Sequence, residues 1–262
     1  MNNVLDFSKK KAAHEKISMI TCYDYTSAKI IDQTNIDCVL VGDSLAMVMH
    51  GCADTTGATL AMMTLHTQAV ARGLTNKFII ADMPFMSYRK SLSKSMMAVE
   101  KLIQAGAQAV KLEGAGTNLT CIEYIVESGV PVMGHIGLTP QHSHALGGLR
   151  VQGKDAAAKN KLLDQAKALE QAGCFAIVLE CIPADLAKLI TASLQIPTIG
   201  IGAGPHTDGQ VLVMHDLLGL QASFKPKFLK NYLNGEAVFK ESIDRYASEV
   251  KACEYPTEEY TY

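Results

Sequence analysis

Short apolar runs alternate with longer helical patterns along the chain, and this alternation constrains the fold more than any other feature. Most of the runs are continuously apolar, which is typical of parallel strands that are covered by helices. The clearest helical patterns span residues 92–105 and 156–172, where apolar side chains recur on one helix face. We expect strands at 17–21, 37–41, 78–82, 108–113, 131–135, 175–180, 197–201 and 210–215.

Eight strands of this kind predict an α/β fold, a closed (βα)8 TIM barrel, for which about 250 residues is the usual size. The chain has 262 residues and is 48% hydrophobic, enough for one large core. Only residues 202–209 separate the last two strands, so we expect an abbreviated seventh unit. We expect a single domain over 1–262, with a final helix at 238–251 and a loose tail at 252–262. An open doubly wound sheet is the structural alternative.

The composition argues against several classes of function. The net charge is −2 and the longest basic run is Lys9-Lys10-Lys11, so no clustered positive charge indicates a nucleic-acid surface. No apolar stretch reaches the ~20 residues that a membrane-spanning helix needs. The 7 cysteines are odd in number and scattered, without a CxxC pair. We therefore expect free thiols and a cytoplasmic protein.

Five of the expected strands run into charged or titratable side chains at or near their carboxyl ends. Catalytic groups of parallel barrels come from the carboxyl ends of several different strands. We therefore expect these side chains to form one site at one rim of the barrel. They are Asp43, Asp82, the pair Lys111 and Glu113, His135 and Glu180.

The three acids Asp43, Asp82 and Glu113 predict a metal site. Clustered carboxylates repel one another, so their convergence requires a cation. Oxygen ligands favour a hard ion such as Mg²⁺, which keeps coordination positions for water or substrate. The alternative for each acid taken alone is a helix cap or a solvated loop.

Lys111 lies two residues before Glu113, so both side chains are expected on one face of the strand. A charged lysine beside acids can bind a carboxylate or a developing oxyanion. A structural ion pair inside the barrel is the simpler alternative, and a Schiff base is also conceivable.

Glu180 and His135 are the candidates for proton transfer and substrate contact. Glu180 ends an apolar run and can act as a general base, the alternative being an acid stabilised at a helix N-terminus. His135 could donate a hydrogen bond to a substrate oxygen. A histidine at a strand end is more often a satisfied core residue, so that alternative also stays open.

Longer motifs surround these residues in a fixed order. They read TCYDY at 21–25, VGDS at 41–44, ADMPFMSY at 81–88, VKLEG at 110–114, PVMGHIGLTPQ at 131–141, AIVLE at 176–180, GIGAG at 200–204 and DGQVLV at 208–213. With these motifs the chain resembles the ketopantoate hydroxymethyltransferase (3-methyl-2-oxobutanoate hydroxymethyltransferase) family over nearly its whole length.

The resemblance implies an enzyme of pantothenate (coenzyme A) biosynthesis that binds Mg²⁺. It implies transfer of a hydroxymethyl group from 5,10-methylenetetrahydrofolate to 3-methyl-2-oxobutanoate, which gives 2-dehydropantoate and tetrahydrofolate. It also implies a homo-oligomer, commonly a decamer in bacteria. The residues it assigns are Asp43, Asp82 and Glu113 to the metal, Asp43, Ser44, Asp82, Lys111 and His135 to the oxoacid, and Glu180 to proton abstraction.

Two other functions remain as alternatives. The first is a Mg²⁺-dependent barrel lyase or mutase for small 2-oxoacids, of the isocitrate lyase and phosphoenolpyruvate mutase type. The Lys-Lys-Cys-Gly-His motif of its lyase members is absent from the sequence. The second is a catalytically idle barrel that binds a metabolite, for which a general base such as Glu180 would have no use.

Overall fold

A computed structural model describes residues 1, 3–221 and 226–262 of the chain. These residues form two compact units, Met1–Val213 and Met214–Tyr262. The first unit contains all eight strands. The expectation of a single domain over 1–262 stays a prediction.

The strands of the first unit close into a barrel. They are β1 (Ile17–Thr21), β2 (Cys38–Val41), β3 (Phe78–Asp82), β4 (Ala109–Lys111), β5 (Val132–Gly137), β6 (Ala176–Glu180), β7 (Thr198–Ile201) and β8 (Gly209–Leu212). Every strand pairs in parallel with the next, and β1 pairs with β8 to close the ring. The predicted (βα)8 barrel is therefore confirmed, and the open sheet is wrong.

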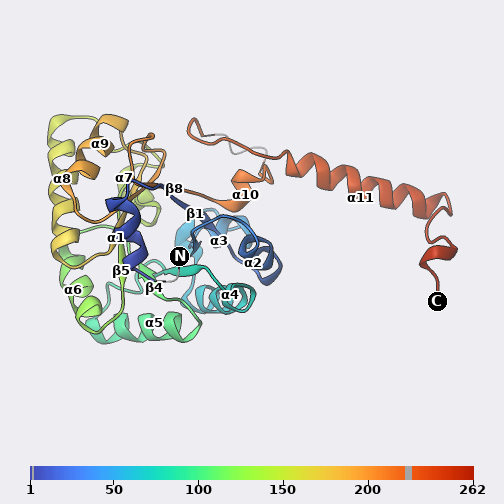
Figure 1. The fold of residues 1–262 in the computed structure, drawn as a ribbon, viewed down its shortest axis with the longest axis horizontal. Helices are drawn as coiled ribbons and strands as arrows, with labels where there is room; N and C mark the ends of the chain where they lie inside the picture. The colour runs from blue at the N-terminus through green and yellow to red at the C-terminus, as the bar shows by residue number, and fades with distance from the viewer. Residues whose placement is uncertain (2, 222–225) are drawn as a thin grey trace. The chain divides into compact units, whose positions relative to one another are not determined.

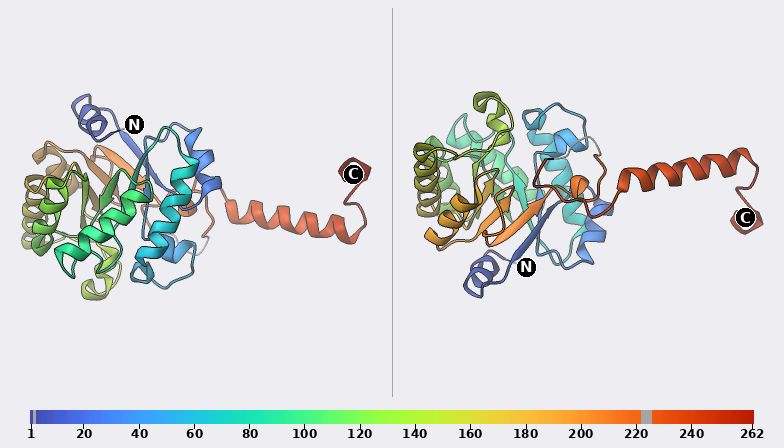
Figure 2. Two further views of the ribbon diagram at one scale, coloured as in Figure 1. Left: turned by 90° about the horizontal axis from the view of Figure 1, so that it is seen from below. Right: turned by 90° about the horizontal axis from the view of Figure 1, so that it is seen from above.

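Helices pack around the outside of these strands (Figures 1 and 2). The covering helices are α2 (Tyr25–Asp32), α4 (Leu60–Gly73), α5 (Leu92–Gln104), α6 (Leu119–Glu127), α8 (Ala156–Gln171) and α9 (Ala184–Ser193). α1 (Leu5–Ala12) precedes the first strand, and α3 (Leu45–Val48) and α7 (Ser143–Leu146) are short helices in the connections after β2 and β5. Between β7 and β8 the described chain makes no helix, which confirms the abbreviated seventh unit.

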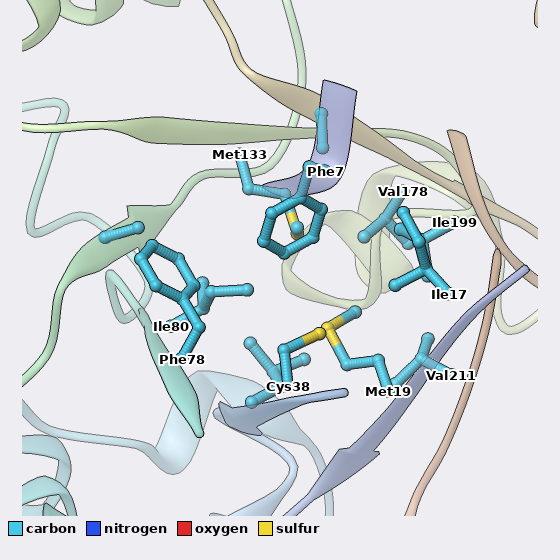
Figure 3. Packing of buried hydrophobic residues seen from close by; sticks show 13 residues of the cluster. Phe7, Ile17, Met19, Cys38, Phe78, Ile80, Met133, Val178, Ile199 and Val211 are labelled. Carbon is cyan, nitrogen blue, oxygen red and sulfur yellow. The ribbon is translucent and has the colours of Figure 1, made fainter. Parts of the chain in front are cut away.

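An aromatic cluster closes the amino-terminal end of the barrel. Phe7 of α1 is fully buried and packs edge-on against Phe78 and Phe175, with ring centroids 5.6 and 4.9 Å apart. Figure 3 shows Phe7 among the inward side chains of the strands, including Met133 and Ile80. Because apolar packing fills this end, polar groups inside the barrel are confined to the opposite, carboxyl end.

Three predicted strand ends differ from the structure, and six strand starts are shifted by one residue. β4 ends at Lys111, so Glu113 follows the strand instead of ending it. β5 continues to Gly137, which places His135 inside that strand. The apolar run predicted as the eighth strand ends early, because the chain turns into the short helix α10 (Met214–Leu217).

The second unit contains α10, the long helix α11 (Gly235–Lys251) and the 3-10 turn η4 (Glu258–Tyr260). The final helix therefore begins three residues before the predicted residue 238. Its side chains Phe239, Ile243, Tyr246 and Val250 are all at least 42% exposed. No helix of the described residues combines the length and the apolar character that crossing a membrane requires.

Candidate active site

The barrel brings the predicted site residues together at the carboxyl ends of its consecutive strands β2 to β6. Asp82 and Lys111 are direct partners in the register of β3 and β4, and Gly137 and Glu180 in that of β5 and β6. At most 5% of each of Asp43, Asp82, Lys111, Glu113 and His135 is exposed to solvent. Five charged or titratable side chains are thus buried at the end of the barrel opposite the aromatic cluster.

The three acids lie close enough to perturb one another. Burial, followed by repulsion from Asp82 and Glu113, raises the pKa of Asp43 well above its ordinary value. The backbone N–H of Asp43 donates to Oδ2 of Asp82 at 3.0 Å. This is the convergence of negative charge that the strand-end pattern predicts.

Lys111 supplies positive charge beside these acids. Its Nζ donates to Oδ1 of Asp82 at 2.6 Å. Burial favours the neutral amine, but the attraction of Asp82, Glu113 and Asp43 outweighs burial and raises the pKa of Lys111. The amine is therefore held protonated, a state suited to binding an anion and unsuited to nucleophilic attack.

His135 lies between two carboxylates. Its Nδ1 is 3.3 Å from Oε1 of Glu113 and its Nε2 is 3.2 Å from Oε2 of Glu180. Neither contact meets the geometry of a hydrogen bond, so the attraction is mainly electrostatic. Burial and Lys111 disfavour the charged ring, but the two glutamates prevail and raise the pKa of His135 to about 9.

Glu180 is the most accessible acid of the group. Its side chain is 18% exposed, against 1% for Glu113, so a bound substrate can reach it. The local backbone fixes its place, because the N–H of Leu138 donates to the Glu180 carbonyl at 2.8 Å. A Cβ on Gly137 would lie 2.2 Å from that carbonyl oxygen, so this approach of β5 to β6 requires glycine.

Ser44 follows Asp43 and joins the same rim. Its Oγ is 2.8 Å from the hydroxyl of Tyr23, which is fully buried. The hydroxyl pair holds the serine side chain in place next to the acids.

Sequence reasoning missed Gln141 and Tyr88, which also belong to this site. The Gln141 side chain is buried and its Nε2 donates to Oδ2 of Asp43 at 2.8 Å. Its backbone N–H donates to Oε2 of Glu113 at 3.0 Å, and its Oε1 accepts from the Tyr88 hydroxyl at 2.6 Å. Both residues lie in the motifs at 131–141 and 81–88, the only signal in the sequence that could have identified them.

The acids fit a divalent cation by their chemistry. They are oxygen donors, the ligands that hard divalent cations prefer, and repulsion from Asp82 and Glu113 adds to the effect of burial in raising the pKa of Asp43. Among the described residues, no group of three or more His, Cys, Asp or Glu side chains is placed so that it could hold a metal ion by itself. An ion held here would therefore complete its coordination with water or substrate oxygens.

Comparison with known proteins identifies the family. A model of the ketopantoate hydroxymethyltransferase family matches residues 2–258. The chain belongs to this family. It is 59% identical to the 3-methyl-2-oxobutanoate hydroxymethyltransferase of Francisella tularensis subsp. tularensis (strain WY96-3418), over 100% of this chain and 99% of that protein. It is 60% identical to the Coxiella burnetii (strain Dugway 5J108-111) enzyme of the same name, over 97% of this chain and 96% of that protein.

Family membership confirms the predicted enzyme class, a hydroxymethyltransferase. Solved structures of lower identity share the fold alone. 2,3-Dimethylmalate lyase, a PEP mutase/isocitrate lyase superfamily member, aligns with a TM-score of 0.66 at 14% identity, over 100% of this chain and 89% of that one. Phosphonopyruvate hydrolase aligns with a TM-score of 0.66 at 12% identity, over 99% and 93%. Proteins of the lyase and mutase type thus have the same barrel fold as this chain. The family match, however, favours the transferase over that alternative.

Proposed function

We propose that this protein transfers a hydroxymethyl group from 5,10-methylenetetrahydrofolate to 3-methyl-2-oxobutanoate with the help of Mg²⁺. The products are 2-dehydropantoate and tetrahydrofolate, which places the reaction in pantothenate and coenzyme A biosynthesis. The observation that carries the proposal is the buried cluster of three carboxylates around Lys111, with the accessible Glu180 on the same rim. The family supports the choice of the oxoacid and of a one-carbon donor.

Asp43, Asp82 and Glu113 would hold Mg²⁺, as their oxygen donors and excess negative charge suit a hard cation. When bound, the ion supplies a Lewis acid that polarises the keto group and acidifies the C3 proton of the oxoacid. Asp43, Ser44, Asp82 and Lys111 would bind the oxoacid, with His135 as a further contact.

Glu180 would take the C3 proton of the oxoacid on its carboxylate. His135, 3.2 Å from Oε2 of Glu180, would orient that carboxylate through electrostatic attraction. The protonated Nζ of Lys111 would stabilise the negative oxygen of the resulting enolate. Burial of Lys111 and His135 limits their contact with water, so their charges act more strongly than they would in solution.

Water would add to the iminium form of the folate co-substrate, and cleavage of its C–N bond would release tetrahydrofolate and the one-carbon unit as formaldehyde. The enolate carbon C3 would then attack the carbonyl carbon of formaldehyde, which forms the new C–C bond. The resulting alkoxide would take the proton held by Glu180 and become the hydroxyl group of 2-dehydropantoate, so no oxidant or reductant is consumed.

The direct test is to incubate the protein with Mg²⁺, 3-methyl-2-oxobutanoate and 5,10-methylenetetrahydrofolate and to detect 2-dehydropantoate by mass spectrometry. Omitting any one of the three should abolish the product. Binding of the oxoacid without turnover under these conditions would favour the idle barrel instead.

We also propose that the protein is a cytoplasmic homo-oligomer, as the family implies, commonly a decamer. Its 7 cysteines are free thiols, in keeping with a reducing compartment. Four exposed apolar residues of α11, Phe239, Ile243, Tyr246 and Val250, are spaced four, three and four residues apart, as in a helix packed against another. We propose one catalytic domain over 1–262, with 252–262 as a tail. Light scattering of the full chain would test the assembly, and a monomer at micromolar concentration would refute it.

A further inference from the structure

The guanidinium of Arg89 lies at the opening of the site, yet no step of the proposed reaction uses it. Arg89 is exposed, in the loop that follows β3. A Cβ on Gly114, the residue after Glu113, would lie 3.6 Å from its Nη2. Its Cζ is 5.4 Å from the ring centroid of the buried Tyr88, whose hydroxyl donates to Gln141. Arg89 is therefore held beside the acid cluster while it remains accessible to solvent.

A neutral histidine fixes the direction of this guanidinium. Nη2 of Arg89 is 2.9 Å from Nε2 of His142. Because an arginine can only donate, that nitrogen must accept, and the ring proton must be on Nδ1, which donates to Oγ1 of Thr139 at 2.9 Å. Burial, followed by the charge of Arg89, lowers the pKa of His142, which keeps the ring neutral. The hydrogen bond to His142 uses one of the five N–H donors of the guanidinium, so most of them remain available to a ligand.

The charge of Arg89 has no acidic partner within the described part of the chain. None of the ion pairs that these residues form includes it. The cations inside the site differ, since Lys111 pairs with Asp82 and His135 lies between two glutamates. A guanidinium binds a carboxylate strongly, through two parallel hydrogen bonds. An arginine that is held in place without one is therefore suited to bind a carboxylate of a ligand.

The chemistry of the two substrates decides which carboxylate this is. The oxoacid is small, and its carboxylate belongs inside the site with Lys111. The folate co-substrate must deliver its one-carbon unit to the same place, but its only carboxylates, those of the glutamate tail, are separated from that unit by an aromatic ring. The acids inside the site would repel these carboxylates, whereas a cation at the opening attracts them.

We propose that Arg89 binds a carboxylate of the glutamate tail of 5,10-methylenetetrahydrofolate, with His142 as the positioning residue that directs the guanidinium. This inference rests on the proposed function, because it takes the folate as the one-carbon donor.

The test measures steady-state kinetics of the full chain with two one-carbon donors, 5,10-methylenetetrahydrofolate and 5,10-methylenetetrahydropteroate, which lacks the glutamate. In the wild type, loss of the glutamate should raise the KM for the donor about tenfold, the equivalent of about 1.4 kcal/mol. Arg89→Met should raise the KM for the folate by a similar factor and should no longer distinguish the two donors. The KM for the oxoacid and the exchange of its C3 proton without folate should stay unchanged, because Arg89 does not touch the reacting atoms.

Two controls separate this role from a general effect of charge or packing. Arg72→Met removes an exposed arginine from the last turn of α4, which precedes β3 at the amino-terminal end of the barrel, and should leave both KM values unchanged. His142→Phe removes the acceptor of Arg89 and should also raise the KM for the folate. His142→Gln provides an acceptor again and should restore the KM.

Equal KM values for the two donors in the wild type would overturn this inference and leave the proposed function standing. So would a loss in Arg89→Met that is the same size for both donors, which indicates a structural role, or a raised KM for the oxoacid. Absence of 2-dehydropantoate with either donor in the wild type would overturn the proposed function as well. Should Arg89→Met fail to fold, His142→Phe decides in its place, since it should reduce the difference between the donors, and an unchanged difference would count against the inference.

Discussion

Replacing Lys111 by methionine removes the lysine from the acid cluster while nearly preserving its volume. Its Nζ is 2.6 Å from Oδ1 of Asp82, and only 5% and 3% of the two side chains are exposed. The variant leaves Asp43, Asp82 and Glu113 buried without this counter-charge. We therefore expect a large loss of stability in the absence of metal.

The distance sets the scale of that loss. At 2.6 Å and an effective dielectric constant of about 20, the attraction of the two charges is roughly 6 kcal/mol. The cost of desolvating both groups offsets part of it, and removal of one partner from a buried pair costs about 3–5 kcal/mol. We expect Lys111→Met to lose free energy of unfolding in this range. Saturating Mg²⁺ should reduce the difference from wild type, since a bound cation neutralises the same acids.

Urea unfolding, followed by circular dichroism with EDTA or with Mg²⁺, measures both effects. Lys167→Met, on the exposed side of α8, is the matched control and should stay within about 0.5 kcal/mol of wild type. A loss below about 1 kcal/mol for Lys111→Met, typical of a surface pair, would refute the reasoning that these charges are buried and coupled.

Four further predictions concern the site. Glu180→Gln should bind Mg²⁺ and the oxoacid normally, but slow exchange of the C3 proton of 3-methyl-2-oxobutanoate in D₂O by about 10²-fold or more, measured by NMR. Exchange at the wild-type rate in this variant would show that another group takes the C3 proton. Asp82→Asn should weaken Mg²⁺ and oxoacid binding together in calorimetry, and unchanged affinity for both would remove Asp82 from the site. Borohydride added during turnover should leave Lys111 unlabelled, because its raised pKa keeps the amine protonated; a reduced adduct seen by mass spectrometry would indicate a Schiff base. The pKa of Asp43 is raised, and protons compete with Mg²⁺ for its carboxylate, so Mg²⁺ affinity should rise with pH until Asp43 is ionised. Titration calorimetry at several pH values would detect this slope, and a flat profile would contradict it.

The sequence predicts the fold well because the signal for parallel strands is local. The predicted strands at 78–82 and 17–21 have the same bounds in the structure. The misplaced end of the eighth strand has a physical cause, since an apolar run continues into α10 and hydrophobicity does not distinguish a strand from a buried helix start. Likewise, β5 runs past His135 because Gly137 allows its close approach to β6.

The site is only partly predictable, for a different reason. Charged residues at strand ends are conspicuous, so Asp43, Asp82 and Lys111 can be found from their position alone. Gln141 lies in a loop after β5 and carries no charge, and nothing local indicates that it is buried beside Asp43. The place of His135 between two glutamates also depends on the register of neighbouring strands, which the sequence of one strand does not contain.

The balance of charge links these features to metal binding. The site contains four carboxylates, those of Asp43, Asp82, Glu113 and Glu180, and two cationic groups, Lys111 and His135. The pKa of about 9 at His135 keeps its imidazole charged at neutral pH. If all six groups were ionised, two negative charges would remain, which is the charge that one divalent cation neutralises. Without the cation, the raised pKa of Asp43 lets the site bind a proton instead. Binding of Mg²⁺ should therefore release protons at any pH at which Asp43 is still partly protonated, and calorimetry in buffers of different ionisation enthalpy measures this release directly.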